Sequence, residues 1–275
     1  MSTAWGMPEL LELMARLRDP DTGCPWDRRQ DFRSVAPHTL EEACEVIDAI
    51  ERADYAQLPE ELGDLLFQVV FHAQLGREQG RFDFDAIVSG LVGKLLARHP
   101  HVFPDGTLDS RRAPDAAPEP TEIRRNWARI KQAERAARGD DGALAGIPLA
   151  LSALTRAAKL QQRAAEYGFD WPDPEPIPDK IREELDEVRQ ARASGDAAHI
   201  REEIGDLLFA CVNLARHLGI DGEAALRAAN RKFERRFDHM IAALDGDVER
   251  FRALSAAAKE ALWQRAKTRA ARDAN

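Results

Sequence analysis

The sequence predicts an all-α protein built from two related helical bundles in tandem. Three observations point to this class: apolar residues recur at helical spacing, alternating strand patterns are scarce, and one order of acidic, apolar and basic residues occurs twice. The chain has 275 residues, of which 44% are hydrophobic. That length is enough for two domains, each with a core of its own.

The helical stripes are clearest beside the acidic residues. Apolar residues recur at helical spacing from Leu62 in the first half and from Ile204 in the second. Another stripe begins at Leu40, and Pro59 suits the first turn of the helix that follows it. We expect each pair of stripes to pack together within a bundle.

Prolines and glycines mark the boundary between the copies. Residues 104–120 hold four prolines and few large apolar groups, and a glycine-rich break follows at 139–142. We predict a first domain over residues 1–104, a linker with a connecting helix over 105–144, and a second domain over 145–275. Trp127 and Lys131 of the connecting helix are expected to pack on the first domain.

Composition limits the class of protein and of partner. The net charge of −9 lacks the basic footprint typical of proteins that bind duplex nucleic acid. The three cysteines form no C-x-x-C pair, so we expect neither a disulfide framework nor a zinc site. No leader peptide and no uninterrupted apolar span is found, and we therefore expect a cytoplasmic protein without a membrane segment.

Two acidic clusters occur in each copy, and their spacing is the same in both. In the first copy, Glu41-Glu42-x-x-Glu45 precedes Glu60-Glu61-x-x-Asp64. In the second, Glu183-Glu184-x-x-Glu187 precedes Glu202-Glu203-x-x-Asp206, at a constant offset of 142 (183 − 41 and 202 − 60). Chance does not explain acids and the apolar residues beside them in one repeated order.

The spacing within each cluster places its carboxylates on one side of a helix. Residues three apart share a helix face, so Glu61 lies beside Asp64 and Glu42 beside Glu45. Like charges at this spacing destabilise a helix by roughly 0.2–0.5 kcal/mol per pair. A divalent cation removes the repulsion, and an all-oxygen ligand set favours Mg²⁺, Mn²⁺ or Ca²⁺. Since Mg²⁺ commonly bridges carboxylates to phosphates, the clusters indicate phosphate chemistry.

Two other interpretations of the acids remain. Acidic runs on helices are usually solvated faces, and Thr39-x-x-Glu42 fits a capping box. The second copy, however, has Ile181 at the position of Thr39 and keeps Glu184, so capping does not explain the repeated acid. Matched clusters in two copies favour a metal site over a solvated face.

Basic and aromatic residues also repeat. Lys94-x-x-x-Arg98 corresponds to Lys232-x-x-x-Arg236, and Trp127-x-x-x-Lys131 corresponds to Trp263-x-x-x-Lys267. Donors on one helix face can hold phosphate oxygens, and a tryptophan can offer its face to a base. A salt-bridged surface and simple packing explain these residues equally well when each is considered alone.

Taken together, these motifs resemble the signature of the all-α nucleoside triphosphate pyrophosphohydrolases, and the tandem arrangement resembles the MazG family. The resemblance covers nearly the whole chain. The further segments that carry it are Gly23-Cys24-Pro25-Trp26-Asp27, Arg98-His99-Pro100-His101-Val102-Phe103, Gly168-Phe169-Asp170-Trp171 and Lys232-Phe233-Glu234-Arg235-Arg236-Phe237.

The resemblance implies a helical homodimer that hydrolyses a broad range of nucleoside triphosphates to monophosphate and pyrophosphate. It implies Mg²⁺ as cofactor, with Mn²⁺ as a substitute, and a carboxy-terminal copy that carries the main activity. The metal ligands it implies are Glu184, Glu187, Glu203 and Asp206, with Glu42, Glu45, Glu61 and Asp64 in the first copy. The nucleotide contacts it implies are Lys232, Arg236, Trp263 and Lys267, with Lys94 and Arg98 corresponding in the first copy.

The hypothesis for mechanism is metal-assisted hydrolysis, in which Glu183 or Glu202 orients or deprotonates the attacking water. Three alternatives stay open at this stage. The enzyme is narrower, acting on dUTP, dCTP or modified nucleotides; the chain is a nucleotide- or metal-sensing module without turnover; or it is a structural scaffold.

Overall fold

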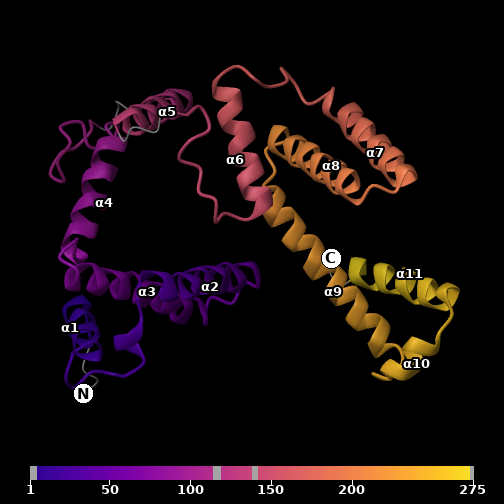
Figure 1. Cartoon of the computed structure of the whole chain (residues 1–275), viewed down its shortest axis with the longest axis horizontal. Helices are drawn as coiled ribbons and strands as arrows, with labels where there is room; N and C mark the ends of the chain where they lie inside the picture. Colours follow the sequence, from indigo (N-terminus) through magenta and orange to yellow (C-terminus); the bar gives the residue numbers. More distant parts are fainter. Residues whose placement is uncertain (1–4, 114–118, 138–141, 273–275) are drawn as a thin grey trace. The chain divides into compact units, whose positions relative to one another are not determined.

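A computed structural model of the chain describes residues 5–113, 119–137 and 142–272 (Figure 1). Those residues form helices, turns and loops, with no β-strand among them, and the predicted all-α class is confirmed. They divide into two compact units, 1–131 and 132–275. None of the described helices combines the length and the apolarity needed to cross a membrane.

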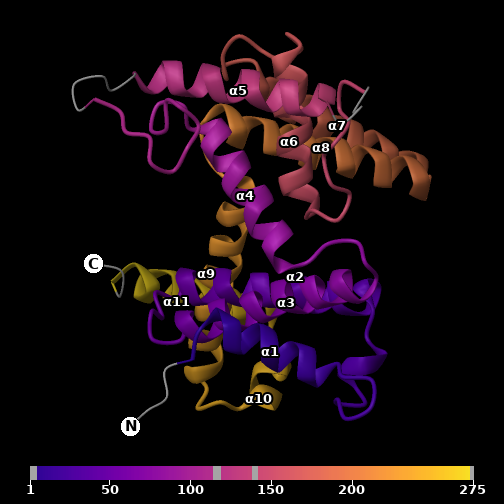
Figure 2. The same ribbon diagram turned by 90° about the vertical axis from the view of Figure 1, so that its left-hand side faces the viewer.

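Unit 1 is built around a helical hairpin. Its helices are α1 (Met7–Leu17), α2 (Phe32–Glu51), α3 (Leu58–Glu78) and α4 (Phe84–Arg98), with a short 3₁₀ helix at Asp27–Arg29, and α5 (Pro120–Ala137) begins in this unit. The helices α2 and α3 run side by side, and α1 packs on α3 (Figures 1 and 2).

Local chemistry fixes where these helices begin. The Asp31 carboxylate accepts hydrogen bonds from the backbone N–H groups of Arg33 and Ser34 and so caps α2. Pro59 lies in the first turn of α3, as the sequence predicts, because a residue there needs no N–H donor. Thr39 lies inside α2 and not at its start, so the capping-box interpretation is wrong.

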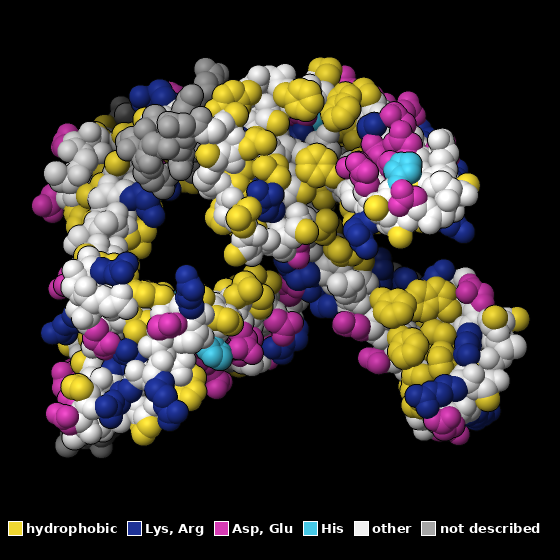
Figure 3. Space-filling view, viewed as in Figure 1, with side chains coloured by type: hydrophobic (Ala, Val, Ile, Leu, Met, Phe, Trp, Pro, Cys, Tyr) yellow, Lys and Arg dark blue, Asp and Glu magenta, His cyan; other side chains and the backbone are white. Residues whose placement is uncertain are grey.

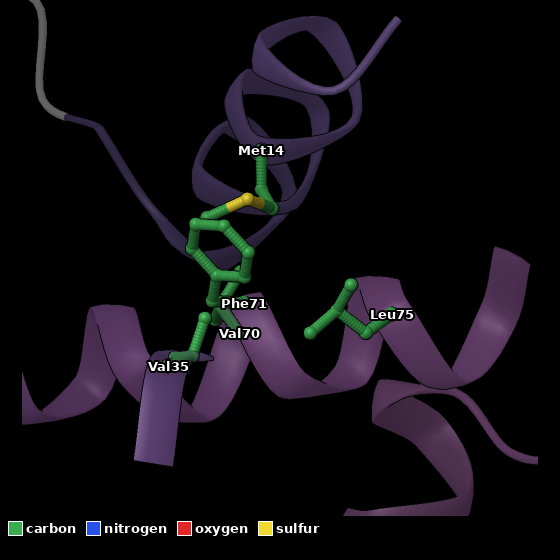
Figure 4. Close-up of a cluster of buried hydrophobic side chains, with 5 residues drawn as sticks. All are labelled: Met14, Val35, Val70, Phe71 and Leu75. Carbon is green, nitrogen blue, oxygen red and sulfur yellow. The ribbon is translucent and has the colours of Figure 1, made fainter. Parts of the chain in front are cut away.

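The core of unit 1 forms where α1 crosses the hairpin. Figure 4 shows Met14 of α1 against the ring of Phe71 on α3, with Val35 of α2 beside them. Val70 and Leu75 complete the cluster, and all five side chains are almost fully buried. Burial of this cluster holds three helices together.

Unit 2 contains a second helical hairpin and, beside it, a pair of packed helices. Its helices are α6 (Ala153–Glu166), α7 (Ile177–Ser194), α8 (Ala197–His217), α9 (Gly222–Ala242), α10 (Val248–Ala253) and α11 (Ala256–Arg272). The helices α7 and α8 pack along each other, α6 packs on α8, and α11 packs on α9 (Figure 1).

A glycine and an aspartate form the short turn between α7 and α8. Gly195 has φ 75°, in the left-handed region that glycine adopts without steric cost. Asp196 follows directly, and its carboxylate accepts from the N–H of Ala198 at 2.9 Å. The chain thus reverses over two residues, which brings the acids of the two helices opposite one another.

The apolar stripes pair as expected, yet part of each stays exposed. Leu40 is 61% exposed and Leu208 is 53% exposed, although both lie on the hairpin helices beside the acids. In unit 1 the buried core lies farther along α3, from Val70 to Leu75, because α1 covers that end of the hairpin. Within one unit, the paired stripes therefore leave large apolar side chains exposed beside the acids.

The connecting segment is helical where it is described. Helix α5 matches the predicted connecting helix, and the Trp127 ring lies 5.7 Å from the guanidinium carbon of Arg98 on α4. Residues 114–118 and 138–141 of the predicted linker, and the side chain of Lys131, lie outside the described residues. The domain boundaries at 104 and 145 stay a prediction.

Candidate metal centre and adjoining pocket

Three carboxylates of unit 2 meet at the α7–α8 hairpin. Oxygen atoms of Glu184, Glu187 and Glu203 all lie within 4.8 Å of one another. Glu184 is only 6% exposed, and Glu203 faces it from α8. Figure 3 shows acidic side chains gathered over α7 and α8 around a histidine. A group of oxygens this close fits the ligand preference of a hard divalent cation.

Unit 1 repeats this arrangement at the equivalent positions. Oxygen atoms of Glu42, Glu45 and Glu61 lie within 4.8 Å of one another, and Glu61 is 7% exposed. Each of these residues precedes its counterpart in unit 2 by 142 positions (184 − 42, 187 − 45 and 203 − 61). The repeat seen in the sequence is thus also a repeat of side-chain geometry.

The remaining predicted acids lie near these groups without joining them. Asp206 is one turn beyond Glu203 on α8 and lines a cavity together with Glu184. Asp64 is one turn beyond Glu61 on α3 and is exposed. The structure therefore brings together three of the four predicted ligands in each unit. Of the predicted water-orienting acids, Glu183 binds Lys180 at 2.7 Å and Glu202 is exposed on α8.

The clustering of charge raises the pKa of one acid in each unit. The pKa of Glu187 lies above its ordinary value, chiefly because burial disfavours the charged form and then because Glu184 and Glu203 are close. The pKa of Glu45 is raised for the same reasons, burial first and then the charges of Glu61 and Glu42. In both units, burial and the neighbouring carboxylates disfavour the charged form, and a bound cation would favour it.

Unit 2 sets two basic side chains against its acids. The Lys180 ammonium lies 2.8 Å from Glu184, and His199 Nε2 lies 2.9 Å from Glu203. Both contacts join residues four apart on one helix, a spacing at which side chains meet, so the sequence carries this signal although neither residue belongs to the acidic motif. The equivalent positions of unit 1 hold other residues, His38 and Gln57, which contact Glu41 and Glu61 respectively.

A cavity of about 600 Å³ adjoins the acids of unit 2. Glu184 and Asp206 line it beside the acidic cluster, and its remaining walls are largely apolar or aromatic. Figure 3 shows hydrophobic side chains beside the acidic ones over this part of unit 2. The further lining residues used below are Gln161, Phe169, Asp170, Trp171, Phe209 and Arg216.

An ion-pair network anchors one wall of this cavity. Asp170 accepts from Arg216 at 2.5 Å and contacts His217 Nε2 at 2.8 Å, which ties the loop before α7 to the end of α8. These partners, the Arg216 hydrogen bond first, hold the pKa of Asp170 down to about 2. Phe169 and Trp171 flank Asp170 in the sequence. The ion pairs of Asp170 therefore also restrain the backbone of these two aromatic residues.

We expect Asp170→Asn to lower the free energy of unfolding by about 1 kcal/mol at pH 7, an amount discounted for the partial exposure of the pair. The folded-state pKa lies below the ordinary value of 3.8, so this stabilisation is complete above about pH 4 and is lost as pH falls toward 2. Urea denaturation at several pH values measures it. Asp186→Asn, which removes an exposed pair with Arg189 within α7, is the control. Equal losses for the two variants at pH 7 would contradict the anchor.

The repeated basic and aromatic residues meet in the same way in both units. In unit 2, the Trp263 ring lies 5.6 Å from the Arg236 guanidinium carbon and 5.9 Å from Lys267 Nζ. In unit 1, Arg98 approaches Trp127 similarly. Lys232 and Lys94 are exposed on α9 and α4. The lining of the 600 Å³ cavity does not include Lys232, Arg236, Trp263 or Lys267.

Comparison with known proteins matches both acidic hairpins. The family described as "MazG nucleotide pyrophosphohydrolase domain" matches residues 30–103 and again 173–241. The chain is 53% identical to a nucleoside triphosphate pyrophosphohydrolase of Escherichia coli (strain K12) over 230 residues, which cover 83% of this chain and 84% of the relative.

A more distant relative aligns over a longer stretch. The nucleoside triphosphate pyrophosphohydrolase/pyrophosphatase MazG of Thermotoga maritima is 39% identical over 259 residues, which cover 94% of each chain. The two family matches contain all eight acids that the resemblance implied as ligands. With two matched copies of the domain and relatives aligned over most of their length, the chain belongs to the MazG family of nucleotide pyrophosphohydrolases.

Proposed function

We propose that this protein uses Mg²⁺ to hydrolyse nucleoside triphosphates to nucleoside monophosphate and pyrophosphate. The proposed substrates include ribo- and deoxyribonucleoside triphosphates with a broad range of bases, and unit 2 is proposed to carry most of the activity. The observation that carries the proposal is the trio Glu184, Glu187 and Glu203, whose oxygens lie within 4.8 Å of one another in a chain of this family. The family match and the names of the two relatives support the reaction type.

The donor set fits Mg²⁺ on chemical grounds. All the clustered atoms are carboxylate oxygens, and the pKa of Glu187 is raised first by burial and then by the nearby charges of Glu184 and Glu203. Glu184, Glu187 and Glu203 would hold the ion, with Asp206 completing the set from the cavity side. When bound, Mg²⁺ supplies charge neutralisation at the phosphates and acidifies a bound water.

The side chains around the acids provide the other roles in the proposal. Glu183 and Glu202 are proposed to orient the attacking water or to accept its proton. Lys232 and Arg236 are proposed to hold phosphate oxygens, and Trp263 with Lys267 to contact the nucleotide. Lys94 and Arg98 take the same part in unit 1. The Lys180 ammonium offsets part of the negative charge of the acidic cluster, and the His199 ring contacts Glu203.

Product analysis tests the reaction. Purified protein with Mg²⁺ and each of ATP, GTP, CTP, UTP and their deoxy forms is expected to release pyrophosphate and the monophosphate, resolved by ion-exchange chromatography. Release of orthophosphate instead would show that the reaction assignment is wrong. Turnover confined to dUTP, dCTP or modified nucleotides would replace broad specificity with a narrower one, and nucleotide binding without turnover would indicate a sensing module.

The exposed apolar stripes support a homodimer in solution. Leu40, Leu62 and Leu208 are large apolar side chains that a single chain leaves at least 48% exposed beside the acidic clusters. Exposed apolar surface of this kind is typical of protein–protein interfaces. We infer a cytoplasmic homodimer, and sedimentation equilibrium of the full chain tests its stoichiometry.

A further inference from the structure

A buried amide side chain lies in the wall of the cavity beside the acids of unit 2. Gln161 on α6 is only 7% exposed and lines that cavity. Within the part of the chain that the structure describes, its Oε1 atom has no hydrogen-bond partner. A buried acceptor without a partner is energetically costly, so such a group in a pocket wall points to a donor on a ligand.

The orientation of this amide is fixed by its other end. Gln161 Nε2 donates to the backbone carbonyl of Phe209 on α8 at 2.8 Å. That bond uses one of the two N–H donors of the amide and sets which way the group points, while Oε1 stays without a partner among the described residues. Oε1 is therefore the unpartnered acceptor in this part of the cavity wall.

The hydrogen-bond partner of Gln161 lies about one helical turn from the nearest acid of α8. Phe209 is three residues after Asp206 on α8, which corresponds to about 5 Å along the helix axis. Asp206, Phe209 and Gln161 all line the one cavity. Phosphates held at the acidic end would thus place the rest of a nucleotide along this wall.

The walls around the acceptor suit a flat, partly polar ring. Phe169 and Trp171 line the cavity, and the Asp170 network anchors the loop that carries both. Aromatic side chains stack on nucleobases whatever the base. A wall of this kind needs only one directed acceptor to fix the edge of the ring.

Unit 1 lacks this acceptor. Its helix α1 packs on α3 as α6 packs on α8, and the buried residue of α1 is the apolar Met14. Met14 is completely buried against Phe71 in the core of unit 1. The helix that packs on the acidic hairpin thus buries a methionine in unit 1 and a glutamine in unit 2.

We propose that Gln161 is a specificity-determining residue of unit 2, whose Oε1 accepts a hydrogen bond from an N–H on the base edge of the bound nucleotide. The inference rests on the proposed function, which supplies the nucleoside triphosphate as the ligand. It adds that the base enters the cavity between α6 and α8, and that unit 1 cannot read the base edge in this way.

The test pairs a ligand change with a residue change. The probes are Mg²⁺ complexes of the non-hydrolysable α,β-methylene forms of UTP and of 3-methyluridine triphosphate, whose uracil has lost its only N–H donor. Calorimetry with wild type, Gln161→Met and the matched exposed control Gln162→Met gives the affinities. Inorganic tripolyphosphate is the probe that has no base.

The wild type and Gln162→Met are expected to prefer the unmethylated ligand, and this preference should shrink by about 3- to 10-fold in Gln161→Met, the value of one neutral hydrogen bond. Tripolyphosphate affinity should be the same in all three proteins. An undiminished preference in Gln161→Met would overturn the proposal and would indicate that a buried water serves Oε1. If Gln161→Met is unfolded by circular dichroism, equal wild-type affinity for the two uridine ligands would overturn it instead.

These readouts are independent of turnover. A wild type that binds the analogues with the expected preference yet releases no pyrophosphate from UTP would contradict the proposed hydrolysis alone. A wild type that releases pyrophosphate but ignores base methylation would contradict the role of Gln161 alone.

Discussion

Glu203→Ala combined with Asp206→Ala is expected to reduce Mg²⁺-dependent release of pyrophosphate by about 1000-fold, because several kcal/mol of charge stabilisation depends on the metal ligands. Glu203 belongs to the trio of close oxygens, and Asp206 lines the adjoining cavity. The assay is pyrophosphate release from saturating ATP and dGTP, with circular dichroism to show that the variant is folded.

The matched control is Glu61→Ala with Asp64→Ala in unit 1. These residues occupy the equivalent helix positions, so the chemical change is the same and only the unit differs. We expect this variant to keep most of the activity, since unit 2 is proposed to be the main site. Comparable losses in both double variants would assign activity to both units, and unchanged activity in the unit 2 variant would refute the proposed site.

Removal of divalent cations is expected to abolish hydrolysis and to lower the melting temperature. Burial and then the charges of neighbouring acids raise the pKa values of Glu45 and Glu187, and a cation that binds only the folded state offsets this cost of the charged forms. Ligand at 100 times its dissociation constant stabilises by about 2.7 kcal/mol, or about 5–10 °C for a chain of this size. Calorimetry after EDTA treatment and after return of Mg²⁺ or Mn²⁺ measures the shift.

Ionic strength needs its own control in that experiment. Added salt screens repulsion between exposed carboxylates without occupying a site. Sodium chloride at the ionic strength of the Mg²⁺ sample should therefore reproduce only a small part of the shift and none of the activity. A melting temperature raised equally by both salts would contradict a specific cation site at the trios.

The two units offer a comparison within one chain. Their trios are equivalent in geometry, but unit 2 places Lys180 and His199 where unit 1 has His38 and Gln57. Unit 2 also has a cavity beside its acids with Gln161 in the wall. These differences give a physical basis for unequal roles of two copies whose acidic motifs are indistinguishable in sequence.

The sequence by itself determined the class of fold, the repeat and the helix face of each acid. Helical period sets which residues share a face, and that is a local property, so Glu184 with Glu187 was predictable from spacing. The constant offset of 142 made the second hairpin predictable from the first. Family resemblance then assigned chemistry to these positions, and the comparisons confirm the family.

Only the tertiary structure decided which acids meet and what lies beside them. Asp206 lines a cavity together with Glu184 but is not among the three acids whose oxygens lie within 4.8 Å of one another, and this depends on how α7 is set against α8. The Gln161 and Asp170 contacts join residues 48 and 46 positions apart, and no local period encodes such pairs. The exposure of Leu40 and Leu208 was likewise hidden from the sequence, because an apolar stripe has the same pattern whether its partner lies in the same chain or in another.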